Sequence, residues 1–150
     1  MSETVIQVTS LGKRIKGKTI LEDISFEINK GDCVALIGPN GAGKTVLMSC
    51  ILGDKKPSSG QVLIDGKAGK AKNKIAVLLQ ENTIPNSLKV EELIAFFQSI
   101  SDNPLTNQEV QELLQFKEDQ YQQFADKLSG GQRRLLAFVL CLIDKPKILF

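Results

Sequence analysis

A glycine-rich turn between an apolar segment and a helix-forming segment constrains the fold of this 150-residue chain more than any other feature. The turn, residues 38–45, reads Gly-Pro-Asn-Gly-Ala-Gly-Lys-Thr and has the form G-x-x-x-x-G-K-T. Residues 34–37 before it are all apolar, which predicts a strand covered on both faces in a parallel sheet. Residues 46–52 after it predict a helix. A strand, a glycine turn and a helix in this order are typical of a phosphate-binding loop in an α/β domain.

Each residue type in the turn has a physical reason to be there. Glycines lack a Cβ atom, so consecutive backbone N–H groups can turn inward and form an anion-binding nest. The N-terminus of the following helix adds a partial positive charge. Lys44 supplies a full charge for the β- and γ-phosphates, and the Thr45 hydroxyl can ligate Mg²⁺. We therefore predict that nucleotide phosphates bind at Gly38, Pro39, Asn40, Gly41, Ala42, Gly43, Lys44, Thr45 and Val46.

The remaining segments alternate between β-rich and helical patterns. Strands are predicted at residues 24–28, 61–64, 74–79 and 148–150. One helix is predicted from residue 90 onward. A second is predicted to begin at the capping box formed by residues 106–109, and a third covers residues 135–143. This order indicates an α/β architecture with insertions.

Composition excludes several classes of function. The net charge of +2 is too small to indicate nucleic acid as the main partner, and a chain without histidine has no histidine base or metal ligand. No apolar run approaches the roughly 20 residues of a membrane span, so we expect a soluble chain. Three cysteines, odd in number and far apart, are expected to be reduced thiols that fill the core: Cys33, Cys50 and Cys141.

A second candidate anion site follows at residues 128–132, which read Leu-Ser-Gly-Gly-Gln. Ser129 is a favourable N-cap, and Gln132 three residues later completes the capping-box spacing. Gly130 and Gly131 leave the N–H groups of the first turn bare, so this helix start can also receive an anion. Two anion sites can face one phosphate chain within a subunit, or each can complete a site with a second molecule. The spacing leaves both options open.

The pentapeptide LSGGQ resembles the diagnostic signature of the ABC ATPase family, and the resemblance extends over essentially the whole chain. Residues 57–62 with Asp65-Gly66 resemble the turn and strand after the phosphate loop, and Gln80 falls where the family has its Q-loop glutamine. Residues 146–150 resemble the approach to the Walker B strand. The resemblance implies a P-loop NTPase of the ABC type, with a parallel core sheet around the P-loop helix, an antiparallel β segment and a helical insert.

The resemblance also implies a function, namely the ATP-binding subunit of a membrane transporter that couples ATP binding and hydrolysis to transport. Lys44 and Gln80 would be catalytic, and Thr45 and Gln80 would contact Mg²⁺. Ser129, Gly130, Gly131 and Gln132 would cap the γ-phosphate of ATP held by a second ATPase subunit. A membrane-spanning permease would hold the subunit at the cytoplasmic side of the membrane. We expect no nucleic-acid partner. Residues 81–85, Leu88 and residues 90–92 resemble the Q-loop and helical insert of exporter-type cassettes, so we expect export.

The main alternative is a soluble ABC-type ATPase of translation or DNA repair. Repair proteins of this family carry a long coiled coil between the phosphate loop and the signature. Here Gln80 and Leu128 are joined by a short helical segment without sustained heptads, which counts against that class.

Two departures from the family pattern stand out. Where the family stacks adenine on an aromatic ring, this chain has Ile15, which offers apolar contact only. Nearby cations at positions 13, 14, 16 and 18 can either assist phosphate or form a solvated basic strand. The Walker B aspartate and the catalytic glutamate would follow Phe150. We therefore expect a partial domain that binds nucleotide at most: residues 1–79 with the P-loop, 80–127 with the Q-loop and helical insert, and 128–150 with the signature helix.

Overall fold

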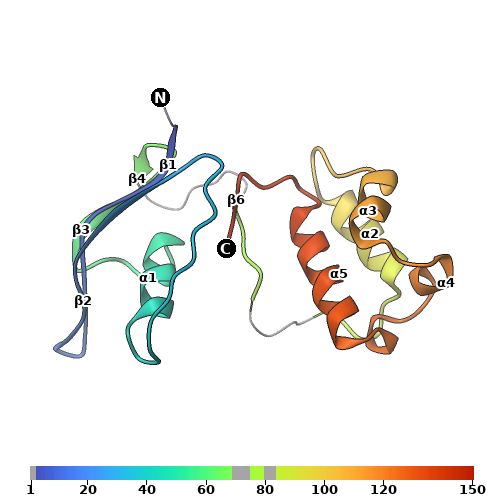
Figure 1. The fold of residues 1–150 in the computed structure, drawn as a ribbon, viewed down its shortest axis with the longest axis horizontal. Coiled ribbons are helices and arrows are strands. Elements are labelled where there is room, and N and C mark those ends of the chain that lie inside the picture. The colour runs from blue at the N-terminus through green and yellow to red at the C-terminus, as the bar shows by residue number, and fades with distance from the viewer. Residues whose placement is uncertain (1–2, 69–74, 80–83) are drawn as a thin grey trace. The chain divides into compact units, whose positions relative to one another are not determined.

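The computed structural model describes residues 3–68, 75–79 and 84–150. The chain forms two compact units, Met1–Ala71 and Lys72–Phe150 (Figure 1). The first unit is mainly β-sheet with one helix, and the second is mainly helical. Among the described residues, no helix is long and apolar enough to cross a membrane.

The first unit is built on a four-stranded antiparallel sheet in the order β2-β1-β3-β4. Its strands are β1 (Thr4–Ile15), β2 (Lys18–Asn29), β3 (Ser59–Ile64) and β4 (Lys67–Ala68). The unit's one described helix, α1 (Lys44–Ile51), lies beside the sheet (Figure 1). The strands predicted at residues 24–28 and 61–64 are confirmed, within β2 and β3 respectively.

Strand β1 has a bulge that changes which side chains face the core. Ile6 and Val8 are buried at the spacing of two expected for a strand, but the next buried residue is Leu11. The register of β1 against β2 shifts between Val8 and Leu11, where Ser10 has a φ of 45°. The extra residue in the bulge lets Leu11 turn inward and leaves Ser10 exposed. The apolar side of the unit therefore continues past the irregularity.

The prediction of a buried strand at residues 34–37 is wrong. This segment has no strand conformation, and the side chains of Val34, Leu36 and Ile37 are 61%, 46% and 90% exposed. A strand requires hydrogen bonds to a neighbouring strand, and among the described residues none pairs with this segment. The apolar run is present in the sequence, but its backbone partner is not found in the described residues.

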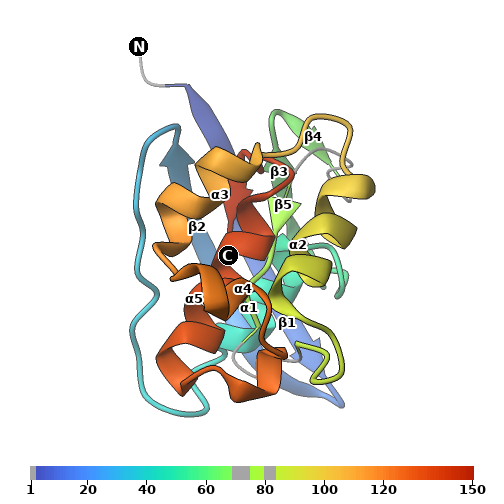
Figure 2. The same ribbon diagram turned by 90° about the vertical axis from the view of Figure 1, so that its right-hand side faces the viewer.

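The second unit packs its helices around α5 (Gly130–Leu142). Helices α2 (Val90–Ser99) and α3 (Asn107–Leu114) contact α5 and lie on either side of it in Figure 2. The short helix α4 (Glu118–Tyr121) and the 3₁₀ helix η1 (Ala125–Lys127) complete the helical part. The core consists of apolar side chains from each of the longer helices, including Val90, Leu93, Val110, Leu114, Leu136, Val139, Leu140 and Ile143.

A short parallel sheet joins the two ends of the second unit. Strand β5 (Ile75–Ala76) pairs with β6 (Ile148–Leu149), and the Leu78 N–H donates to the Phe150 carbonyl across 2.7 Å. The strand predicted at residues 148–150 is present as β6 over Ile148–Leu149, but it is not buried as predicted, because Leu149 is 38% exposed. The strand predicted at residues 74–79 is present only as Ile75–Ala76, and residue 74 lies outside the described residues.

The predicted helix starts are also confirmed in this unit. Thr106 caps α3, because its hydroxyl accepts a hydrogen bond from the Glu109 N–H at 3.2 Å and its own N–H donates to the Glu109 carboxylate at 2.7 Å. The bond from the Thr106 N–H to the carboxylate is the main reason that the pKa of Glu109 lies below its usual value. The helix predicted from residue 90 is α2, and the helix predicted at residues 135–143 forms most of α5.

The cysteines correct one expectation. Cys50 is buried and Cys141 is partly buried, and burial raises the pKa of both thiols. Cys33 is exposed, so it does not fill the core. Cys33 immediately precedes the apolar segment at residues 34–37, whose own side chains are exposed. Its apolar neighbours in the sequence therefore do not place the Cys33 side chain in the core. All three thiols are free.

Candidate functional site

The glycine turn at residues 38–45 is a tight loop that ends at the N-terminus of α1. Gly41 and Gly43 have φ angles of 84° and 91°, which lie in the left-handed region that glycine adopts without strain. Gly43 is the N-cap of α1, and its carbonyl accepts the first helical hydrogen bond, from the Leu47 N–H at 2.8 Å. Among the loop amides, Ala42 donates to the Pro39 carbonyl at 3.2 Å. The N–H groups of the first turn of α1 remain open to an anion.

Lys44, the first residue of α1, is held at this loop by its own backbone. Its ammonium group donates to the carbonyl of Gly38 at 2.6 Å and to that of Pro39 at 2.8 Å. An ammonium group has three N–H donors, so one remains for a phosphate oxygen. The Gly38 and Pro39 carbonyls are therefore functional groups that the sequence analysis missed. It counted the loop only as a source of N–H donors, and no pattern in the sequence marks which carbonyls turn toward the lysine.

Strand β2 packs closely against the loop at Gly43. A Cβ atom placed on Gly43 would lie 2.9 Å from the Leu21 Cδ2 atom and 3.3 Å from the Ile20 carbonyl oxygen. Glycine is thus required at this position for two reasons, the left-handed backbone and the close approach of β2. The sequence analysis did not identify Ile20 and Leu21 as part of the site, and their apolar character resembles that of any core strand.

We expect Gly43→Ala to weaken both the fold and anion binding. The left-handed conformation costs a non-glycine residue about 1–2 kcal/mol, and the contact with Leu21 adds to it. Urea unfolding measures the first effect, and calorimetric titration with ATP measures the second.

The matched control is Gly31→Ala. Gly31 has a φ of 89°, but a Cβ atom added there would have no other atom within 4 Å. It carries the backbone strain alone and lies outside the loop. If both variants lose the same stability and bind ATP equally well, the close packing against β2 has no role in shaping the loop.

The second candidate anion site lies at the start of α5. The Ser129 hydroxyl accepts a hydrogen bond from the Gln132 N–H at 3.2 Å, and the Ser129 N–H donates to the Gln132 side-chain oxygen at 3.0 Å. This confirms the predicted capping box. Cβ atoms added to Gly130 and Gly131 would meet nothing within 4 Å, so the first turn is open. The site belongs to the second unit, whereas the Lys44 loop belongs to the first.

The other predicted site residues fall in three different settings. Ile15 is the last residue of β1, is half-buried, and pairs with Lys18 across the hairpin turn. Thr45 is exposed in the first turn of α1, and its hydroxyl is available as one oxygen ligand for Mg²⁺. Gln80 lies outside the described residues, so its contact with metal and water stays a prediction. Asp144, which follows α5 and was not predicted as a site residue, accepts a hydrogen bond from the Ser101 hydroxyl.

Among the residues that the structure describes, no three histidine, cysteine or acidic side chains form a group able to hold a metal ion. Mg²⁺ at a nucleotide takes most of its ligands from phosphate and water, with one or two from protein. The Thr45 hydroxyl at the helix start fits that limited role.

Comparison with known proteins identifies the family. The model of the ABC transporter family matches residues 21–150. The methionine import ATP-binding protein MetN of Legionella pneumophila (strain Paris) is 35% identical over 97% of this chain and 46% of its own length. The spermidine/putrescine import ATP-binding protein PotA of Protochlamydia amoebophila is 34% identical over 93% of this chain and 39% of its own. The chain thus spans less than half the length of these relatives.

Solved structures support the fold. The chain superposes on cbiO1 of Clostridium perfringens, part of the ABC transporter complex cbiONQ, with a TM-score of 0.82 and 24% identity, covering 98% of this chain and 64% of that one. It also matches an ATP-binding cassette of an ABC transporter in its ADP conformation, with a TM-score of 0.81 and 24% identity over 99% of this chain and 68% of that one. The expected P-loop NTPase fold of the ABC type is confirmed. The expected parallel core sheet is present in the described residues only as the pair β5 and β6, and the sheet of the unit that contains α1 is antiparallel.

The expectation of export is not supported. The MetN and PotA relatives are named as import proteins. The resemblance to exporters rests on residues 81–85, Leu88 and residues 90–92, of which 81–83 lie outside the described part of the chain. The family assignment does not depend on direction, because it rests on the match over residues 21–150 and on the loop and signature described above. The chain belongs to the ABC transporter family.

Proposed function

We propose that this chain binds ATP through the loop at residues 38–46 and forms part of the ATPase that drives a membrane transporter. The observation that carries the proposal is the Lys44 ammonium group, held at the loop by the Gly38 and Pro39 carbonyls beside the open N-terminus of α1. This arrangement provides a full charge, a helix dipole and unused N–H donors at one place. Those groups together suit a di- or triphosphate. The direct test is the loss of ATP binding when the Lys44 ammonium is removed.

Hydrolysis in the whole protein would require Mg²⁺ and an oriented water molecule in addition to this loop. When bound, Mg²⁺ would supply positive charge that stabilises the negative charge of the phosphate groups. We assign Thr45 as its ligand in this chain, with Gln80 as the second contact that the family pattern implies. Lys44 would stabilise the charge that develops on the transferred phosphoryl group.

We further propose that ATP is shared between two copies of the ATPase subunit. The start of α5 has a satisfied cap at Ser129 and an open turn at Gly130 and Gly131, and it carries no lysine of its own in that turn. Such a site can contact the γ-phosphate of a nucleotide held elsewhere, but it cannot replace the Lys44 loop. A permease partner would then hold the subunit at the membrane. The alternative, a soluble ATPase of translation or DNA repair, is less well supported, because the MetN and PotA relatives are named as import proteins.

Mixing two inactive variants tests the sharing of ATP. In the whole protein, Ser129→Arg blocks the helix start and Lys44→Ala disables the loop, so neither variant should form ATP-dependent dimers alone. An equal mixture can assemble one intact composite site per dimer. We expect ATP-dependent dimers in the mixture, measured by light scattering coupled to size-exclusion chromatography.

The matched control is Thr106→Arg, which alters the capping box of α3 rather than that of α5. This variant should retain ATP-dependent dimers, after allowance for the loss of about 1 kcal/mol from its cap. If the mixture never dimerises while each protein remains folded, the two anion sites are not shared between subunits.

A further inference from the structure

The helices between residues 90 and 126 carry a strong negative charge that the proposed ATPase function does not use. This stretch contains eight aspartate and glutamate residues and one basic residue, Lys117, whereas the whole chain has a net charge of +2. The excess charge lies on α2, α3, α4 and the loops between them. An acidic surface on a folded unit attracts cations, and its effect depends on whether the surface also offers a shaped site.

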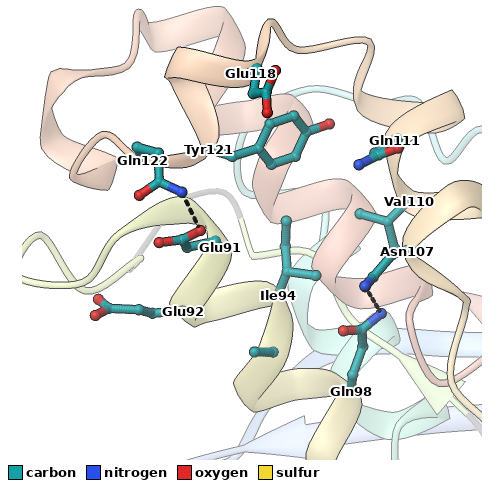
Figure 3. Close-up of a pocket in the computed structure, with 11 residues that line it drawn as sticks. Glu91, Glu92, Ile94, Gln98, Asn107, Val110, Gln111, Glu118, Tyr121 and Gln122 are labelled. Atoms are coloured by element: carbon teal, nitrogen blue, oxygen red, sulfur yellow. Dashed lines mark hydrogen bonds between the residues drawn. The ribbon is translucent and has the colours of Figure 1, made fainter.

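A cavity of about 520 Å³ lies among α2, α3 and α4, within the second unit (Figure 3). Its apolar lining comes from Ile94 on α2, Val110 on α3 and the ring of Tyr121 on α4. Ile94 and Val110 are 6% and 1% exposed, so they form a fixed floor rather than mobile surface groups. The volume is within the range of about 300–1,000 Å³ that is usual for small-ligand sites.

Three carboxylates line the same cavity, and no lysine or arginine does. Glu91 accepts a hydrogen bond from the Gln122 amide at 2.6 Å, as Figure 3 shows, and Glu92 accepts one from the Lys89 N–H at 2.8 Å. Glu118 makes no hydrogen bond within the described residues. In that same part of the chain none of the three is in an ion pair. Their negative charge is therefore available to a ligand.

Amide groups add oriented acceptors to the lining. The Gln98 NH₂ group donates to the Leu105 carbonyl at 2.9 Å. It also donates to the Asn107 side-chain oxygen at 3.0 Å, the bond drawn in Figure 3. These bonds fix the Gln98 amide and leave its carbonyl oxygen as an acceptor. The cavity thus combines an apolar floor with acceptors and negative charge, which favours a donor-rich cation and disfavours an anion.

We propose that this cavity binds an organic cation, namely an alkylammonium or guanidinium group carried on an apolar stem. The carboxylates do not converge into a group of three that could hold a metal ion, so a compact inorganic cation is poorly matched. An apolar stem would lie on Ile94 and Val110, and the ring of Tyr121 can add a cation–π contact. The charged end would meet Glu91 and Glu118. The same chemistry can be supplied by a free amine or by a lysine or arginine side chain of a partner.

Titrations followed by NMR test the proposal with probes of one shape and different charge. n-Hexylamine should shift the resonances of Ile94 and Tyr121, whereas n-hexanol and hexanoate should not. Binding should weaken as ionic strength rises. Glu118→Gln and Glu91→Gln should each weaken hexylamine binding by about two- to fivefold, as expected for partly exposed ion pairs. Ala95→Phe, which fills the cavity without changing charge, should abolish binding.

The matched control is Asp119→Asn, which removes one charge from the same helix, α4, at a residue outside the cavity. Its affinity for hexylamine should equal that of the unaltered chain.

A peptide with one lysine and blocked ends distinguishes the two sources of the cation. Tighter binding of the peptide than of hexylamine identifies a partner side chain, and the reverse identifies a free amine. The proposal is overturned if hexylamine does not bind, if hexanol or hexanoate binds as well, or if Asp119→Asn weakens binding as much as Glu118→Gln.

Discussion

Lys44→Ala is expected to reduce the affinity for ATP by about 10- to 100-fold. A hydrogen bond to a charged group contributes about 1.5–3 kcal/mol, and here the lost group is also the full positive charge of the loop. The free energy of unfolding should change by less than about 0.5 kcal/mol, since the hydrogen bonds of the Lys44 ammonium within the described residues go to the exposed Gly38 and Pro39 carbonyls. Calorimetric titration with ATP and urea unfolding measure the two quantities.

Lys55→Ala is the matched control for this substitution. Lys55 follows α1 and is exposed. Its replacement by alanine removes the same charge from a residue outside the loop. If Lys55→Ala lowers ATP affinity as much as Lys44→Ala does, net charge rather than the loop governs binding. Undiminished affinity in Lys44→Ala would show that the loop is not the phosphate site.

Leu136→Ala is expected to destabilise the second unit by about 2–5 kcal/mol. Leu136 on α5 has no exposed surface and lies in the cluster formed by α2, α3 and α5, so the smaller side chain leaves a cavity. Domains of this size are stable by only about 5–15 kcal/mol, which makes this loss a large fraction of the total. The chain has one tyrosine and no tryptophan, so the fluorescence of Tyr121 reports on this unit during urea unfolding.

Leu135→Ala is the control, because this neighbouring leucine is 36% exposed. It removes the same atoms from the partly solvated side of α5 and should cost less than half as much. Equal losses for the two leucines would mean that the helices of this unit are not packed as described.

The sequence predicted those parts of the fold that depend on local rules. Capping boxes at Thr106 and Ser129 located two helix starts, because the side chain and backbone groups involved are only three residues apart. The apolar pattern alone located α5 only from residue 135, because the glycines in its first turn carry no hydrophobic signal. The tight glycine turn was likewise predictable from the motif, and two of its glycines, Gly41 and Gly43, have the left-handed backbone that glycine adopts without strain.

Features that depend on distant neighbours were not predictable in the same way. Residues 34–37 have the composition of a buried strand, yet burial depends on a pairing strand that composition does not reveal. The bulge at Ser10 changes which residues of β1 face inward, and no pattern in the sequence marks it. At the site, the sequence identified Lys44 but not the carbonyls that hold it or the support from Leu21, because both arise from the folded path of the chain.

The two hydrogen bonds that hold Lys44 also affect the entropy of anion capture. A lysine side chain that is free in solvent loses up to about 2 kcal/mol of rotamer entropy when it becomes fixed. In this loop the Gly38 and Pro39 carbonyls fix the side chain when the chain folds, so an arriving phosphate does not have to order it. Anion affinity is then partly a property of the loop's rigidity. A substitution in β2 that loosened the support at Leu21 would weaken capture without altering any atom that touches the anion.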